Sequence, residues 1–331
     1  MLLRHGSFGV QVTALEKALA ALGFYKGPID TSFGGGLEAA VVAFQKAHDI
    51  LTDGVVGPMT ADDINDALTA GNYPGLSLDF GTPAPVSAVP PPVPLPKMQV
   101  VRCVADIAHG SQGYDHLYLR EDAATAFTAL RNDVLALGGI LTTAGGLRGL
   151  SSLAGAARSR TSFHYVGLAY DLALDSGAQR PATDPYIIIP DPDHDRQWLV
   201  YARSTLDPAV LAGKCSALGI HGGELTLQGV QVTTVGKDRI HVTSVPVTAT
   251  VFCLSELAAL HGFHKIRSRP VFVNGEDYSG MEFWHHQFSD VLTPHVSTFG
   301  ATLLQIHTQA EAEAFVYFSA AKNCVYGVDW F

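Results

Sequence analysis

The chain has 331 residues, a net charge of −10, 47% hydrophobic residues and 16% charged residues. This length fits one small module and one larger domain, and the composition is that of a folded chain rather than a disordered one. The sequence contains no basic run, which argues against nucleic-acid binding, and no apolar stretch of the ~18 residues that a membrane span requires.

The first 70 residues carry a helical pattern. Apolar residues recur at helical spacing from Val12 to Leu22 and again from Ala40 to Phe44. Glycines and the Gly57-Pro58 pair separate these segments, as expected of turns. The residues by themselves predict a helical bundle, which could serve as a spacer or as a docking unit.

Two signatures in this region make a resemblance specific. They are Gly23-Phe24-Tyr25-Lys26-Gly27-Pro28-Ile29-Asp30 and Asp53-Gly54-Val55-Val56-Gly57-Pro58-Met59-Thr60. Together they resemble the small three-helix peptidoglycan-binding domain that is often fused to wall hydrolases. The resemblance implies such a domain over residues 1–70, with peptidoglycan as its partner. Thr31 and Leu37 depart from the family, which prefers Gly and Thr at these positions.

Residues 71–97 form a predicted linker that is rich in proline. The prolines are Pro83, Pro85, Pro90, Pro91, Pro92, Pro94 and Pro96. Such density favours an extended polyproline spacer with limited flexibility. It could be an inert connection, or a tether for an enzyme that searches peptides near its anchoring point.

The second domain is predicted over residues 98–331. Apolar residues at helical spacing predict an amphipathic helix over 121–137, which Gly138-Gly139 ends. The segment Ile140 to Thr143 is typical of a strand, and it leads to Arg148. Near the other end of the chain, Thr302 to Ala321 is predicted to be helical.

Strict alternation from Leu168 to Leu174 predicts a strand with Asp171 on its less apolar face. The neighbours of Asp171 on that face are Ala169 and Ala173, which leave room for a metal ion. Gly167 would let the backbone bend so that His164 folds over the same place. The alternative is an ordinary half-buried strand with a surface histidine beside it.

A long insertion over 176–280 separates this strand from the next polar motif. It contains an acidic loop, Asp191 to Asp195, which could bind calcium but is more typical of a solvated loop. The stretch from Leu225 to Phe252 alternates and predicts a hairpin that turns at 236–238. The insertion could roof an active site or decorate the surface.

The second motif is Glu282-Phe283-Trp284-His285. With His164 and Asp171 it offers two imidazoles and a carboxylate, a set that leaves one position of a zinc ion open for water, as catalytic zinc requires. Glu282 could then accept the proton of that water. This combination predicts an enzyme.

The two motifs together resemble the zinc D-alanyl-D-alanine carboxypeptidases and L-alanyl-D-glutamate peptidases, whose fold is shared with hedgehog domains. The family pattern Ser-x-His-x-x-Gly-x-Ala-x-Asp, followed by Glu-x-Trp-His, is matched at every fixed position. The resemblance implies an α+β domain with a central antiparallel sheet, interrupted here by the long β-rich insertion. It also implies one Zn²⁺ per chain held by His164, Asp171 and His285, with Glu282 as catalytic base.

The family also carries an arginine before the first motif, and Arg148 stands at the matching position. The resemblance implies that Arg148 steadies an oxyanion or a peptide carboxylate, although Arg158 and Arg160 lie closer to the ligands in sequence. We expect Ser162 to bind substrate or orient its loop. We expect Trp284 to pack beneath the site at the edge of the substrate.

Other polar residues carry weaker patterns. His261 and His264 are expected at the surface, and His286 either supports the site or points away from it. Cys103, Cys215, Cys253 and Cys324 lack the Cys-x-x-Cys spacing of a zinc knuckle, and nothing chooses a disulfide pairing among them.

We therefore expect a zinc-dependent peptidoglycan peptidase that hydrolyses amide bonds of the stem peptide. Endopeptidase action is favoured over D-alanine trimming, since trimming alone does not weaken the wall. The alternatives are a non-catalytic zinc-containing wall-binding protein and an N-acetylmuramoyl-L-alanine amidase. Met1 to Gly6 hold no apolar leader. We therefore expect either that a leader is missing from the sequence or that the protein reaches the wall without one, for example through host lysis or an injection apparatus.

Overall fold

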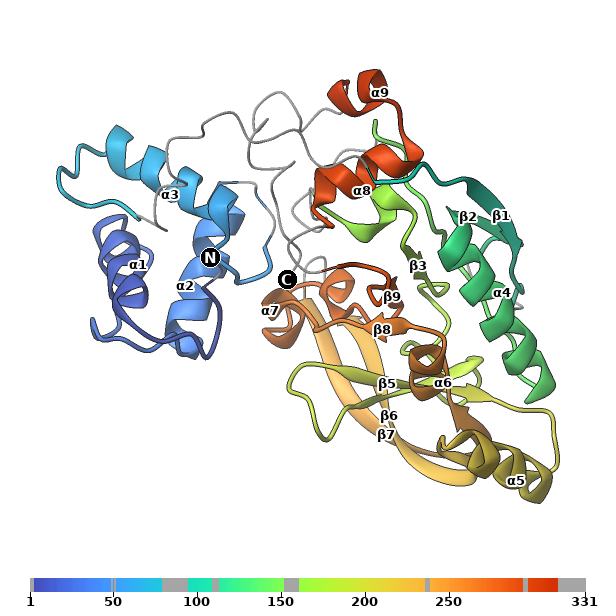
Figure 1. Ribbon diagram of the computed structural model, residues 1–331. Helices are drawn as coiled ribbons and strands as arrows, with labels where there is room; N and C mark the ends of the chain where they lie inside the picture. Colours follow the sequence, from blue (N-terminus) through green and yellow to red (C-terminus); the bar gives the residue numbers. More distant parts are fainter. Residues whose placement is uncertain are drawn as a thin grey trace.

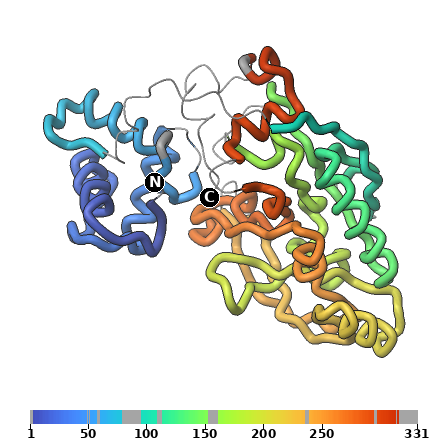
Figure 2. The backbone as a smooth tube through the Cα atoms, in the orientation of Figure 1, coloured from blue at the N-terminus to red at the C-terminus, as the bar shows by residue number. Residues whose placement is uncertain are grey.

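The computed structural model describes residues 3–48, 50, 52–78, 95–108, 113–151, 161–235, 239–293 and 297–314. A helical N-terminal domain precedes a larger, sheet-rich C-terminal domain, and both can be followed along the chain in Figures 1 and 2. The predicted α+β fold class is confirmed. None of the helices within these ranges combines the length and apolar character needed to cross a membrane.

The N-terminal domain consists of α1 (Val10–Ala21), α2 (Gly35–Ala47) and α3 (Pro58–Ala70). The helices enclose a core of their own, with α1 packed against both α2 and α3. The apolar residues whose spacing predicts the helices supply this core: Leu15, Leu19, Val41 and Phe44 are fully buried.

Gln45, near the end of α2, holds the turn formed by the second signature of this domain. Its side-chain amide donates to Asp53 Oδ1 at 2.8 Å and to the Val55 carbonyl at 2.9 Å, while its oxygen accepts the Gly54 N–H at 2.9 Å. The buried amide thereby closes the turn that leads into α3. Pro58 begins that helix, where its missing N–H costs nothing.

Over its described residues, the C-terminal domain combines strands and helices. Its elements are β1 (Val100–Val104), β2 (His116–Arg120), α4 (Glu121–Ala136), η1 (Phe163–Val166), β3 (Ala169–Asp171), β4 (Tyr186–Pro190), β5 (Trp198–Arg203), α5 (Pro208–Leu218), β6 (Gly222–Val235), β7 (Arg239–Cys253), α6 (Leu254–Leu260), β8 (Phe263–Lys265), α7 (Pro270–Val273), η2 (Tyr278–Met281), β9 (His285–Phe288), α8 (Phe299–Ile306) and α9 (Gln309–Glu313). The predicted helix over 121–137 is thus confirmed as α4, which buries Phe127, Leu130 and Val134.

The strands form three antiparallel sheets. The first is the pair β1-β2, the second has the order β3-β9-β8, and the third has the order β4-β5-β7-β6. The third sheet lies wholly within the predicted insertion. Its long hairpin β6–β7 confirms the predicted one, whose turn at 236–238 lies outside the described residues.

Two local predictions were wrong. Ile140 to Thr143 is not a strand: Asp106 accepts the Leu141 N–H and Tyr186 Oη accepts the Thr142 N–H, both at 2.9 Å, so these donors do not enter a ladder. The predicted helix from Thr302 is divided, because Thr308 caps a new helix in a reciprocal bond pair with Glu311. Residues 315–321 of that prediction lie outside the described residues.

Candidate metal centre and the pocket of the N-terminal domain

The pairing of β3 with β9 brings two of the three predicted ligands, Asp171 and His285, together. In the register of β3 and β9, Asp171 lies directly opposite His285. The backbone of Asp171 is held on its other side as well, because its N–H donates to the Gly145 carbonyl at 2.9 Å and its carbonyl accepts the Ala144 N–H at 2.7 Å. Two motifs far apart in sequence therefore become cross-strand neighbours.

His164 reaches the same place from η1. The Ser162 hydroxyl accepts the His164 N–H at 3.3 Å, which makes Ser162 the cap of this short helix. Gly167 ends the helix with φ 68°. A Cβ at this position would lie only 2.8 Å from the backbone nitrogen of Arg120. Only glycine fits this left-handed, closely packed turn, which directs the chain from His164 into β3.

The three side chains converge on one point. His164 Nε2 lies 3.2 Å from His285 Nδ1 and 3.1 Å from Asp171 Oδ2, and His285 Nδ1 lies 3.0 Å from Asp171 Oδ1. Among the residues that the structure describes, this is the one group of three or more potential metal ligands whose donor atoms all lie within 4.8 Å of one another. His164 Nδ1 contacts the Gly146 carbonyl at 2.7 Å. Donation through Nδ1 leaves the lone pair of Nε2 directed at the cluster.

The electrostatics of the cluster favour metal coordination. Burial lowers the pKa of His164, and the influence of Asp171 in the opposite direction does not restore it. Burial would raise the pKa of Asp171, but the two imidazoles outweigh it and hold that pKa well below its usual range. A neutral imidazole and an ionised carboxylate are the forms that bind metals. A buried set of two nitrogens and one oxygen fits a zinc ion that keeps an open position.

Glu282 lies beside the cluster in an unusual backbone conformation. It follows η2 with φ 60°, a left-handed value that non-glycine residues rarely adopt. Its side chain is 7% exposed, and Arg269 Nε lies 2.5 Å from its Oε1. Burial raises the pKa of Glu282, although Arg269 and His285 oppose the shift. Such strained residues persist only where the surroundings fix them, as is common in active sites.

A cavity of about 460 Å³ opens over these groups. Its walls include Arg148, Ser162, Trp284 and Arg269 together with the ligands and Glu282. Arg148 is held by its own N–H, which donates to the His164 carbonyl at 3.0 Å, and its Nη2 lies 3.4 Å from Asp171 Oδ2. The structure therefore brings Arg148 to the cluster; Arg158 and Arg160 lie outside the described residues.

Trp284 and His286, the two chain neighbours of His285, differ in their relation to the cavity. Trp284 is 6% exposed, borders the cavity, and accepts the Leu172 N–H through its carbonyl at 2.9 Å. His286 points away from the ligands, with its ring stacked on Tyr170 at 5.1 Å. The burial of His286 lowers its pKa to about 4.

The remaining polar candidates lie elsewhere. In the acidic loop, Asp191 pairs with Lys265, and Asp195 pairs with Arg267 at 2.8 Å. The two histidines before the second motif pair with aspartates, His261 with Asp133 at 2.9 Å and His264 with Asp290 at 2.8 Å. Three of the four cysteines are buried and free, namely Cys103, Cys215 and Cys253, and Cys324 lies outside the described residues.

Sequence reasoning missed Arg269. It caps α7, and its N–H donates to the Gly280 carbonyl at 2.7 Å, which turns the side chain toward Glu282. The Arg269-Pro270 pair does signal the start of a helix. Nothing in the local pattern indicates that this helix starts beside the predicted base.

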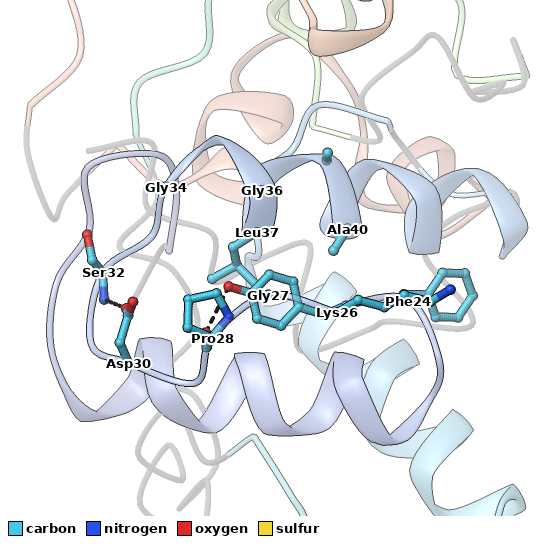
Figure 3. A pocket seen from close by; sticks show the side chains of 12 residues that line it. Phe24, Lys26, Gly27, Pro28, Asp30, Ser32, Gly34, Gly36, Leu37 and Ala40 are labelled. Atoms are coloured by element: carbon cyan, nitrogen blue, oxygen red, sulfur yellow. Dashed lines mark hydrogen bonds between the residues drawn. The ribbon is translucent and has the colours of Figure 1, made fainter.

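The N-terminal domain has a pocket of its own, of about 510 Å³ (Figure 3). One wall is the start of α2, with Gly36, Leu37 and Ala40, and the other is the loop that begins at Phe24. This loop is fixed by local hydrogen bonds: Tyr25 Oη donates to the Pro28 carbonyl at 3.0 Å. The pocket thus lies on the first of the two signatures that resemble the wall-binding family.

Comparison with known proteins supports this assignment. Residues 9–63 match the family described as "Putative peptidoglycan binding domain". Among solved structures, the crystal structure of the Burkholderia AP3 phage endolysin is 36% identical over 19% of this chain and 24% of that chain, with a TM-score of 0.19. The crystal structure of the SleB N-terminal domain is 30% identical over 22% of this chain and 93% of that chain, with a TM-score of 0.20.

These likenesses are confined to a short part of the chain. The match spans about a quarter of the endolysin's length, at 24%. Both TM-scores are low, so the two structures do not define the fold of this chain. No curated protein matches it. The family match identifies the N-terminal domain as a peptidoglycan-binding module, and peptidoglycan is the partner that it indicates.

Proposed function

We propose that the chain is a zinc-dependent peptidoglycan peptidase, carried to its substrate by the N-terminal domain. The observation that carries the proposal is the convergence of His164, Asp171 and His285 at the floor of a cavity that also holds Glu282. Three ligands with a carboxylate beside them are the arrangement of a hydrolytic metal site rather than a structural one.

Each residue of the cleft has a defined task in this mechanism. Bound zinc supplies Lewis acidity, which lowers the pKa of a water molecule and polarises a peptide carbonyl. Glu282 accepts the proton of the attacking water and returns it to the leaving amine. Arg148 lies within 3.4 Å of Asp171, so its guanidinium can face the oxygen that becomes negative, or a carboxylate of the peptide.

Ser162 and Trp284 border the same cavity and would contact the peptide. Ser162 already accepts the His164 N–H, so its role in orienting the ligand loop is compatible with a bond from its hydroxyl to substrate. Trp284 supplies an apolar surface beneath the peptide.

We propose that the bond cut lies within the stem peptide or its cross-links. A wall-binding domain attached to the peptidase favours substrates that belong to the insoluble polymer. Breaking such bonds opens the mesh, whereas removal of a terminal D-alanine leaves it connected. The site of action is accordingly the bacterial cell wall.

Product masses test this proposal. The zinc-loaded chain is incubated with a purified disaccharide pentapeptide and with cross-linked dimers, and the Glu282→Gln variant serves as the control. Cleavage between amino acids of the dimer by the wild-type chain alone is the expected result. Free D-alanine as sole product would replace endopeptidase action by carboxypeptidase action, and a cut at the lactyl amide would indicate an amidase. No cut at all would contradict the enzymatic function.

A further inference from the structure

The N-terminal domain contacts the C-terminal domain through α2, next to α7 (Figure 1). Glu38 at the start of α2 pairs with Arg196 at 2.7 Å, and Lys46 near the end of α2 pairs with Glu276 at 3.2 Å. Both partners flank α7 in space, one on the loop before β5 and one just after the helix. The contact therefore covers one defined surface of the C-terminal domain.

The two ion pairs differ in their exposure. The Lys46–Glu276 side chains are 65% and 46% exposed, whereas the Glu38–Arg196 side chains are 14% and 12% exposed. With the domains in contact, removal of either charge would leave the other buried and poorly compensated, since the second acid near Arg196, Asp195, lies at 3.7 Å. The inner pair therefore makes the docked arrangement sensitive to the loss of either charge.

Close packing accompanies the inner pair. Gly54, in the turn that Gln45 closes, lies against α7, and a Cβ at this position would approach Pro270 Cγ to 3.0 Å. Pro270 is the first residue of α7. The N-terminal domain thereby touches the residue that follows Arg269.

The covered surface is the outer side of the cleft wall that carries the predicted base. The Ser268 N–H donates to the Arg196 carbonyl at 2.6 Å, and the Ser268 hydroxyl donates to the Met281 carbonyl at 2.8 Å. Arg269 then contacts Glu282 at 2.5 Å. A continuous series of bonds leads from Arg196, where the N-terminal domain docks, to Glu282 in the cavity.

The segment before Glu282 has little freedom of its own. A Cβ at Gly280 would lie 2.8 Å from Val271 Cγ2, so η2 packs closely on α7. Because Glu282 itself has a left-handed backbone, its side chain depends on these neighbours for its orientation. A displacement of α7 would therefore move the carboxylate of Glu282.

We propose that the N-terminal domain stays docked on this surface, and that Arg269 is a positioning residue through which the docked domain holds Glu282 in the cleft. The role of Glu282 rests on the proposed function, whereas the docking does not. In this arrangement the C-terminal domain does not move freely about its linker. With the domains docked, the pocket of the N-terminal domain and the peptidase cleft keep a fixed mutual orientation.

Cross-linking tests the docking without any activity measurement. In a Cys324→Ser background, the pair Lys46→Cys and Glu276→Cys is treated with a short bis-maleimide. A matched control replaces Lys17, which is exposed on α1, in place of Lys46. The interface pair should link within the chain at least tenfold faster than the control pair. Equal rates for the two pairs would show free movement of the domains and overturn the docking.

Charge reversal tests the coupling on a soluble stem peptide, which requires no wall binding. Glu38→Arg should lower kcat by about tenfold or more, the scale expected for a displaced catalytic group, with little change in KM. The double variant Glu38→Arg and Arg196→Glu should restore kcat, and Lys17→Glu should leave it unchanged. An unaltered kcat in Glu38→Arg would overturn the coupling.

Variants of Arg269 test its role directly. Arg269→Met should lower kcat at an unchanged Tm and zinc content, and Arg269→Lys, which keeps the charge, should recover part of the loss. Equal kcat values for the Met and Lys variants would overturn the positioning role. A wild-type chain without peptidase activity would overturn both that role and the proposed function, while the cross-linking result would still decide the docking.

Discussion

In the N-terminal domain Gln45 is fully buried, and its side-chain amide is hydrogen-bonded to the turn that it closes. The amide donates to Asp53 and to the Val55 carbonyl and accepts the Gly54 N–H, at 2.8–2.9 Å. In the C-terminal domain His164 is almost equally buried, but only one of its ring nitrogens has a backbone partner. The other faces His285 and Asp171, whose own atoms also point inward.

This difference separates a structural polar group from a functional one. A buried group whose bonds are complete stabilises the chain that surrounds it. The buried side chains of His164, Asp171 and His285 converge from three elements, and together they could hold a metal ion. Substitutions at four buried positions test whether the two kinds of buried group differ in this way, and a substitution at Gly36 tests the pocket of the N-terminal domain.

Loss of the metal should have the largest effect. In the proposed mechanism His285→Ala removes one of three zinc ligands and chelation removes the zinc itself, so both should abolish hydrolysis of the stem peptide, since the activation of water depends on the metal. Zinc content by mass spectrometry and product release by chromatography provide the measurements. Activity that survives in the metal-free chain would contradict the assignment of the cluster.

Glu282→Gln should lower kcat by about 10²–10⁴-fold, the contribution of a general base, while zinc content stays at the wild-type level. The raised pKa of Glu282 also fixes a sign for the pH dependence. Because the carboxylate must be ionised to accept a proton, activity should fall as the pH drops through a pKa above 4.5. If activity fell only at a pH below 4.5, that profile would contradict the role of Glu282 as the base.

His286 is a buried polar group that neither closes a turn nor joins the cluster, and its effect should appear in stability. Its pKa in the folded chain is about 4, below the ordinary value of 6.5. The unfolded chain therefore binds a proton first, and the free energy of unfolding should fall between pH 6.5 and 4, by up to about 3 kcal/mol from this group. Denaturant titrations of wild-type and His286→Gln chains should diverge in this range. Parallel curves would refute the prediction.

Gln45→Ala should destabilise the N-terminal domain by ~1–3 kcal/mol, since it leaves the Gly54 N–H and the Asp53 carboxylate without their buried partner. Thermal unfolding of the full chain gives the measurement. The saturated amide predicts a loss of stability, in contrast to the loss of turnover expected at the metal cluster. If Gln45→Ala left the unfolding temperature unchanged, the prediction that Gln45 stabilises the N-terminal domain would be wrong.

The smallest effect should come from filling the pocket of the N-terminal domain. Gly36 lines it, and a Cβ at this position would have no neighbour within 4 Å, so the indole of Gly36→Trp should extend into the pocket. Binding to insoluble peptidoglycan should weaken by about tenfold, or about 1.4 kcal/mol. Gly35→Trp is the control, because Gly35 has equal space outside the pocket lining. Equal retention of both variants in a sedimentation assay would exclude the pocket as the binding site.

Features that depend on near neighbours in the chain could be predicted from the amino-acid sequence. Helical spacing predicted α4, alternation predicted the β6–β7 hairpin, and the turn residues of the N-terminal domain predicted the family that the comparison identifies. His164 and Asp171 also belong here, because a single glycine turn joins them. In each case the interacting residues lie within one element or one turn, where local periodicity carries the information.

Features that depend on segments far apart emerged only in the folded chain. Ile140 to Thr143 is not a strand there, since side chains of Asp106 and Tyr186 take the backbone donors. Packing also turned His286 away from the ligands and brought Arg269 to Glu282. Finally, it placed Glu38 on Arg196, which joins the two domains. Periodicity contains no trace of such contacts, because they arise only when independently formed elements pack and bury their charges together.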